Sequence, residues 1–192
     1  MSFSPTDELR PVPRRSLTQK PAALVIGALM LAVPLVPMIA DATLPPRQWN
    51  PAEPSAEELT AVTEDGDVVV IETPQGWEAL DGGDSAVLRH DGAAVYVDVY
   101  DRGDRDPDAV AERLIRQHRI QGITSALDGG TIELPDGTLT GDTCVVVTAS
   151  ATGTCAFLHD DDVIVSVLSL AEPGQPAPPI SQVLELFSRR QQ

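Results

Sequence analysis

Residues 143–170 read TCVVVTASATGTCAFLHDDDVIVSVLSL and contain three segments rich in β-branched and other apolar residues. These segments are Thr143–Ala149, Cys155–His159 and Val163–Leu170, and short polar stretches separate them. Runs of this length and composition are typical of β-strands, and short connections join antiparallel neighbours. The region therefore predicts three strands of a largely antiparallel sheet.

Upstream of this region, four other runs predict additional strands. The run Ala93–Tyr100 alternates valine with tyrosine and aspartate, which is the period-2 pattern of a strand with one polar face. Asp91-Gly92, immediately before it, is a typical two-residue hairpin turn. We expect strands at Val68–Ile71, Ser85–His90, Ala93–Tyr100 and Ile132–Leu134.

Two segments have helical spacing instead. In the first, Asp106 is a typical N-cap, Pro107 suits a first helical turn, and apolar residues recur at helical spacing as far as Ile120 before Gly122. The second follows the proline-rich stretch 173–179 and places Ile180, Val183, Leu184 and Phe187 on one face. Together the elements predict an α+β domain over residues 66–190, a largely antiparallel sheet packed with two helices.

Residues 22–40 form an apolar run of 19 residues without a charge. At about 1.5 Å of rise per residue, a helix of this length spans about 30 Å, the thickness of a hydrocarbon core. We therefore predict a cytoplasmic tail at 1–21 and a transmembrane helix at 22–40.

The flanking charges predict the orientation of this helix. Residues 1–21 carry four basic and two acidic side chains (4 − 2 = +2), whereas the chain after Ala40 carries nine basic and 27 acidic ones (9 − 27 = −18). Basic flanks stay cytoplasmic, so we expect a single-pass cell-membrane protein whose C-terminal domain is extracytoplasmic. A secreted protein is the alternative, because Ala40-Asp41-Ala42 fits an A-x-A signal cleavage site near Ala42.

Residues 41–65 contain four prolines, Pro45, Pro46, Pro51 and Pro54. Proline favours extended, poorly packed backbone, so this segment is expected to be a semi-stiff extracytoplasmic linker. Glu53–Leu59 is also compatible with a short helical turn.

Cys144 and Cys155 are the two cysteines of the chain. Both belong to the expected extracytoplasmic domain, where disulfides persist, and we predict that they form a structural disulfide. Direct pairing would centre a hairpin on Ala149-Ser150, which are poor turn residues, whereas Gly153 suggests a turn nearer 150–153. A bulge, a longer loop, or strands that are not simple neighbours would each reconcile these observations.

The composition excludes some functions. A formal net charge of −16 argues against a nucleic-acid partner, which requires a basic surface. The acid cluster Asp101 to Asp108 invites a calcium interpretation, but counting from Asp104 puts Ala109 at position six and Ile115 at position twelve, where an EF-hand loop has glycine and glutamate. We read it as the start of a helix and expect no metal and no cofactor.

The sequence also contains no recognisable catalytic constellation. Gly83-Asp84-Ser85 resembles the serine motif of some hydrolases, but an apolar pair follows it, as in a strand. A hydrolase would need a histidine beside a serine or an acid in one cleft. We therefore expect no catalytic residues, and we expect Trp77 to be a core or edge anchor rather than a ligand-stacking residue.

The order of elements, with Thr73-Pro74-Gln75-Gly76-Trp77-Glu78 after the first strand, resembles the Mog1p/PsbP-like fold over residues 68–190. Arginine outnumbers lysine twelve to one, a usage common in high-GC bacteria such as actinobacteria. Single-pass actinobacterial envelope proteins with such ectodomains include the trehalose monomycolate transport factor family. This resemblance implies a role beside a large lipid transporter and implies no catalytic residues.

These expectations converge on a non-enzymatic, membrane-anchored accessory subunit or scaffold of a cell-envelope membrane complex, such as one for envelope lipid transport. Its partner would be a larger integral-membrane protein complex. The alternative is an extracytoplasmic ligand- or lipid-binding module, which requires an apolar pocket between sheet and helix.

Overall fold

The computed structural model describes residues 68–190 in full, the backbone of 56–60, and five single positions, Ile26, Met30, Val33, Leu35 and Ile39. The chain divides into two units, Met1–Pro46 and Arg47–Gln192. Within the described residues, no helix is long and apolar enough to span a membrane. The expected tail at 1–21, most of the anchor at 22–40 and most of the linker at 41–65 lie outside the described residues.

The second unit is built on a seven-stranded sheet in the order β3-β4-β5-β9-β8-β7-β6, and every neighbouring pair is antiparallel. These pairings confirm the expectation of a largely antiparallel α+β fold. The strands are β3 (Glu78–Asp81), β4 (Ser85–His90), β5 (Ala93–Asp101), β6 (Thr124–Glu133), β7 (Thr140–Val147), β8 (Thr152–His159) and β9 (Val163–Ala171).

Helix α2 (Pro107–Ile120) carries the chain from β5 to the far edge of this sheet. From β6 the chain returns strand by strand, so that β9 pairs with β5 from Ala93↔Ala171 to Asp101↔Val163. The helix begins after Asp106, as expected, but the Asp106 side chain makes no capping hydrogen bond. Gly122 follows the helix with a φ of 83°, a conformation that a residue with a Cβ rarely adopts.

A second, three-stranded sheet contains β1 (Ala56–Thr60), β2 (Val68–Glu72) and β10 (Phe187–Arg190), with β2 in the centre. Strand β1 falls within the range expected to be a linker, and the backbone there is extended rather than helical. The expectation for the closing helix was wrong at its end. Helix α3 spans Ile180–Leu184, and Phe187 opens β10, where pairing with Ile71 of β2 buries it.

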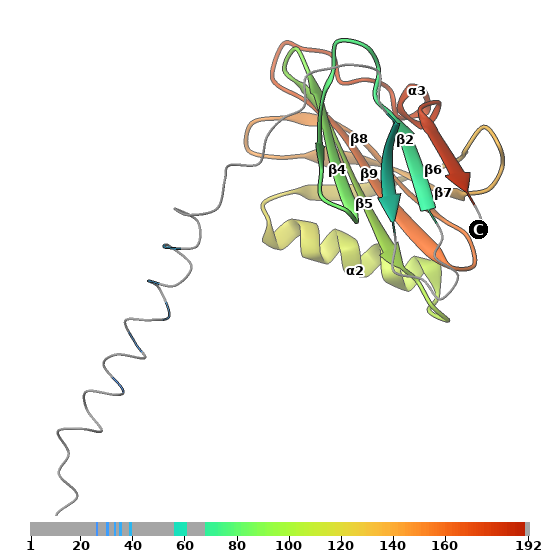
Figure 1. The fold of residues 1–192 in the computed structure, drawn as a ribbon, viewed down its shortest axis with the longest axis horizontal. Coiled ribbons are helices and arrows are strands. Elements are labelled where there is room, and N and C mark those ends of the chain that lie inside the picture. The colour runs from blue at the N-terminus through green and yellow to red at the C-terminus, as the bar shows by residue number, and fades with distance from the viewer. Residues whose placement is uncertain are drawn as a thin grey trace, which may run out of the picture. The chain divides into compact units, whose positions relative to one another are not determined.

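The domain has three layers, with α2 on one face of the large sheet and the small sheet with α3 on the other (Figure 1). One apolar cluster joins β2, β10 and α3 to the large sheet, and the other joins α2 to β7, β8 and β9. Strand β9 contributes to both, because Val165 points into the first cluster and Ile164 into the second. All nine residues of β9 are buried, which explains its nearly continuous apolar sequence.

Candidate functional site

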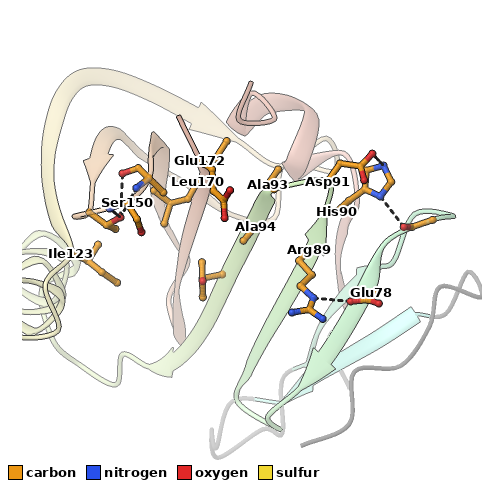
Figure 2. Close-up of a pocket in the computed structure, with 16 residues that line it drawn as sticks. Glu78, Arg89, His90, Asp91, Ala93, Ala94, Ile123, Ser150, Leu170 and Glu172 are labelled. Carbon is orange, nitrogen blue, oxygen red and sulfur yellow. Dashed lines mark hydrogen bonds and ion pairs between the residues drawn. The ribbon is translucent and has the colours of Figure 1, made fainter. Parts of the chain in front are cut away.

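A groove of about 780 Å³ lies where β4 turns into β5, on the end of the large sheet (Figure 2). The strand register places Glu78, Arg89, Ala94 and Leu170 in one row across β3, β4, β5 and β9. Residues directly opposite one another in such a ladder share a face of the sheet. The small side chain of Ala94 stands between the larger Arg89 and Leu170, and this difference in size hollows the surface.

The two sides of the groove differ in character. Ile123, which follows α2, and Ala151, in the turn between β7 and β8, form an apolar wall beside Leu170. Tyr96, two residues beyond Ala94 on the same face of β5, also lines the groove and is 38% exposed. The groove therefore offers an apolar surface that an extended apolar group could cover.

The opposite rim is charged. Arg89 Nε donates a hydrogen bond to the Glu78 carboxylate at 2.7 Å, and both side chains are about half exposed. His90 contacts the Gly76 carbonyl oxygen through Nδ1 at 2.8 Å, and its Nε2 lies 3.2 Å from the Asp91 carboxylate. No hydrogen bond joins His90 to Ser150, which lines the other side of the groove, among the contacts of the described residues.

A second hollow, of about 470 Å³, lies between Trp77, helix α3 and the proline-rich loop. Leu88 and Val95 form its floor, and the residues from Pro176 to Pro179 form one side. Trp77 follows a turn in which its N–H bonds to the Pro74 carbonyl oxygen at 3.1 Å, and Gly76 supplies the φ of 91°. Trp77 packs against the core, as expected of an anchor, and it also stacks on His90 at 5.6 Å.

Acidic and phenolic groups meet on β5, on the face that also carries Tyr96. Burial raises the pKa of Asp98, and the nearby carboxylate of Asp84 raises it further. Burial and the same two carboxylates raise the pKa of Tyr100 to about 12. Ser85, the serine of the hydrolase-like motif, pairs with Asp98 across β4 and β5, whereas the nearest histidine in the sequence, His90, ends the same strand five residues away.

The other two histidines lie elsewhere. His118 of α2 is buried against the sheet and stacks on Phe157 at 6.2 Å between ring centroids. Desolvation lowers its pKa, and its Nδ1 has no hydrogen-bond partner among the described residues. His159 ends β8 and lines a shallow hollow with Asp108 and Asp142. Within residues 68–190, the hollow that His159 lines contains no serine, whereas the groove contains both His90 and Ser150.

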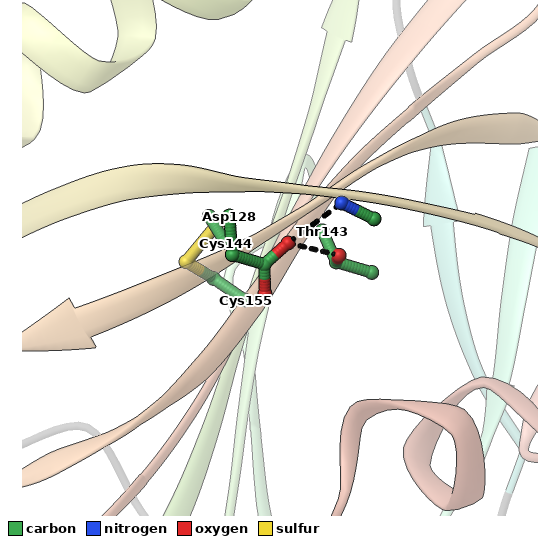
Figure 3. Close-up of a disulfide and its surroundings, with 5 residues drawn as sticks. Asp128, Thr143, Cys144 and Cys155 are labelled. Carbon is green, nitrogen blue, oxygen red and sulfur yellow. Dashed lines mark hydrogen bonds between the residues drawn. A yellow bond between two sulfur atoms is a disulfide. The ribbon is translucent and has the colours of Figure 1, made fainter.

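Cys144 and Cys155 are direct partners on β7 and β8, and their sulfur atoms lie at disulfide distance, 2.12 Å (Figure 3). The strands are simple neighbours, and residues 148–151 form the loop. Thr148 compensates for the poor turn residues Ala149 and Ser150. Its hydroxyl accepts hydrogen bonds from the N–H groups of Ser150 and Ala151 at 3.3 and 2.9 Å.

The acid-rich segments serve local structure. Asp101 accepts a hydrogen bond from the Gly103 N–H at 2.8 Å, which shapes the loop before α2. Asp160 accepts hydrogen bonds from the N–H groups of Asp162 and Val163, both at 2.9 Å, in the turn between β8 and β9. No group of three metal-ligating side chains comes together among the described residues.

Sequence reasoning did not identify the groove. Its floor depends on Ala94 lying between Arg89 and Leu170, which are 5 and 76 positions away in the chain. The Ala93-Ala94 pair that opens a strand otherwise rich in valine and tyrosine is the one local signal. The chain matches no protein-family model, and no curated protein matches it significantly.

Proposed function

We propose that this chain is a non-enzymatic, membrane-anchored accessory subunit of a cell-envelope membrane complex, and that its groove receives an apolar segment of a larger membrane protein. The observation that carries the proposal is the groove itself, an apolar floor at Ala94, Tyr96 and Leu170 beside a charged rim. A volume of about 780 Å³ is within the range of protein binding clefts.

The charge of the domain favours a protein partner. Residues 68–190 carry eight basic and 20 acidic side chains, a balance of 8 − 20 = −12. Anionic lipid headgroups repel such a surface, whereas a basic protein surface attracts it. The partner would therefore present an apolar segment bordered by basic residues.

The proposed topology has the N-terminus in the cytoplasm, an anchor at 22–40 and the folded domain outside; secretion after cleavage near Ala42 is the alternative. The cysteine pair at disulfide distance supports an extracytoplasmic domain, because disulfides persist mainly in oxidising compartments.

The finer fold assignment is also a proposal. The order of β2, a Pro-x-Gly-Trp turn, the strands β3 to β5, helix α2, a meander and α3 supports an assignment to the Mog1p/PsbP-like fold, whereas β1 and β10 are additional to that order. Membership of a group similar to the trehalose monomycolate transport factor family would make the partner a lipid transporter.

A second candidate function rests on the hollow beside Trp77. Its lining is largely apolar, with Leu88, Val95 and the proline-rich loop around it, and it has room for part of an acyl chain. In this candidate the protein is an extracytoplasmic module that binds an envelope lipid.

Photocrosslinking in native membranes separates the two candidates. A benzophenone amino acid replaces Tyr96 in the groove or Gln182 beside the second hollow, and the exposed α2 position Gln117 is the control. An adduct with one membrane protein from position 96, absent from 117, supports the accessory role. A lipid adduct from position 182 alone supports the second candidate, and equal adducts from all three positions contradict both.

A further inference from the structure

Strand β6 is the outer strand of the large sheet, and its two halves differ. Its register against β7 is interrupted between Leu127 and Thr131. Asp128 in this bulge accepts hydrogen bonds from the Gly130 N–H and the Thr143 hydroxyl, and these hydrogen bonds lower the pKa of its carboxyl group. A bulge and a charge are two common devices by which proteins prevent an edge strand from pairing.

The first half of β6, Thr124–Leu127, has neither device. Regular pairing with β7 occupies one side of it, and among the described residues no strand pairs with the other side. Its outward N–H and C=O groups can therefore accept another strand. Segment 123–127, which reads ITSAL, contains no charge.

Exposed apolar side chains gather at this same edge. Within residues 68–190, five large hydrophobic side chains are exposed, and four belong to α2, β6 or β7 at this side of the sheet. Val145 and Val147 of β7 lie directly opposite Ala126 and Thr124 of β6, so these four residues share a face. The four exposed side chains lie on both faces of this edge: Ile120 and Leu127 on the side of α2, and Val145 and Val147 on the opposite side.

The net charge of −16 makes two copies repel one another over most of their surfaces, so a contact between copies must be confined to an uncharged stretch. The uncharged stretch Ile123–Leu127, together with the flanking valines, removes this repulsion locally. The second copy carries the same extended, uncharged strand, so it can supply the strand that pairs with this edge.

We propose that β6 pairs with β6 of a second copy of this chain, antiparallel and about a two-fold axis through Ser125. Opposite residues must lie on the same face of a continuous sheet, so the axis passes through a residue, and Ser125 is the centre of the uncharged segment 123–127. Ser125 then faces Ser125, Thr124 faces Ala126, and Ile123 faces Leu127 of the other copy. Two seven-stranded sheets become one, and the pairing extends no further than the bulge at Asp128.

Cysteine crosslinking tests this register. One chain carries Thr124→Cys and a differently tagged chain carries Ala126→Cys, and the two are co-expressed in native membranes and oxidised. Directly opposite residues have Cα atoms about 4.5–5.5 Å apart, within reach of a disulfide, whereas diagonal neighbours are too distant. We expect a mixed dimer from the pair and little from either variant alone. A crosslink only to a different protein, or none at any concentration, would overturn the proposal.

A charge substitution tests the energetics of the proposed β6 interface. Leu127→Glu places a carboxylate opposite the apolar Ile123 twice per dimer, and Tyr96→Glu adds the same charge on a distant strand. In sedimentation of the full chain, we expect Leu127→Glu to weaken dimerisation about tenfold or more and Tyr96→Glu to leave it unchanged. Equal effects of the two substitutions on dimerisation, with Cys144–Cys155 still oxidised in both variants, would contradict the β6 interface. Loss of the photocrosslink from position 96 without a change in dimerisation would concern only the proposed function.

Discussion

Arg189 Nη2 lies 2.9 Å from the Asp160 carboxylate, and the Arg189 side chain has no solvent exposure. The contact joins β10 of the small sheet to the turn between β8 and β9 of the large sheet. Asp162 lies further away, at 3.9 Å. A buried cation of this kind stabilises the fold only while its carboxylate neighbours remain charged.

Asp160→Asn tests this ion pair. The amide oxygen can still accept the two N–H groups of the turn, so the substitution removes mainly the charge beside Arg189. We expect a loss of about 3 kcal/mol in the free energy of unfolding, measured by denaturant titration. Asp161→Asn, at a fully exposed neighbour, should change it by less than about 0.5 kcal/mol. Similar effects from both substitutions would contradict a stabilising Asp160–Arg189 pair.

Reduction of the cysteine pair should destabilise the domain. The bond closes a loop of about 12 residues, for which loss of the crosslink costs about 3 kcal/mol in the chain-entropy model. Both cysteines are buried, so we also expect the reductant to act mainly during unfolding. Thermal unfolding with and without reductant measures the shift. If reductant left the midpoint of thermal unfolding of the wild type unchanged, and this midpoint equalled that of the Cys144→Ala/Cys155→Ala variant, no disulfide would form between the two residues.

His118 should make stability depend on pH. Desolvation lowers its pKa in the folded state, so the folded protein favours the neutral imidazole. Unfolding is therefore increasingly favoured as the pH falls below about 6.5, the value for an unperturbed histidine. His118→Gln should reduce this acid-side loss of stability, measured by thermal unfolding from pH 7.5 to 5. If the variant lost stability with falling pH as steeply as the wild type, the loss would be due to titratable groups other than His118.

Asp98 should have the opposite dependence. Burial and Asp84 raise its pKa, so the folded state favours the protonated form and loses stability as the pH rises above about 3.8, the unfolded value. At neutral pH, Asp98→Asn should therefore stabilise the domain. The same substitution at the exposed Asp108 is the control, and denaturant midpoints at pH 4 and pH 7 provide the comparison. A destabilising Asp98→Asn at pH 7 would show that the carboxylate has a favourable partner.

Ala94→Phe should fill the groove between Arg89 and Leu170. Because the position is half buried and opens onto the groove, we expect a change of about 1 kcal/mol or less in stability. Co-purification of the proposed membrane partner should fall to background. Ala109→Phe, at an exposed position on α2, makes the same chemical change away from the groove and should leave co-purification intact. Retained co-purification in Ala94→Phe would exclude this groove as the docking site.

Much of the fold followed from local patterns. The strands that begin at Val68, Ser85 and Ala93 agree with the structure, as do the start of α2 after Asp106 and the hairpin turn at Asp91-Gly92. The sequence-based expectations were wrong where an apolar residue fits both a helical and a strand pattern. Phe187 fits the helical spacing that starts at Ile180, yet pairing with β2 places it in a strand. The length of β6 was underestimated, because Gly129 and Gly130 occupy its bulge.

The sequence by itself determined the antiparallel α+β class and the two helices, because hydrophobic period and turn residues act over a few positions. The structure showed that β7 and β8 are direct neighbours and that Cys144 lies opposite Cys155. Only the tertiary structure decided which strands are neighbours, and with them the groove at Ala94, the buried Arg189 and the edge at Thr124–Leu127, with whose outer side no described strand pairs. Each depends on residues far apart in the chain that meet through the register of strands, which no local pattern specifies.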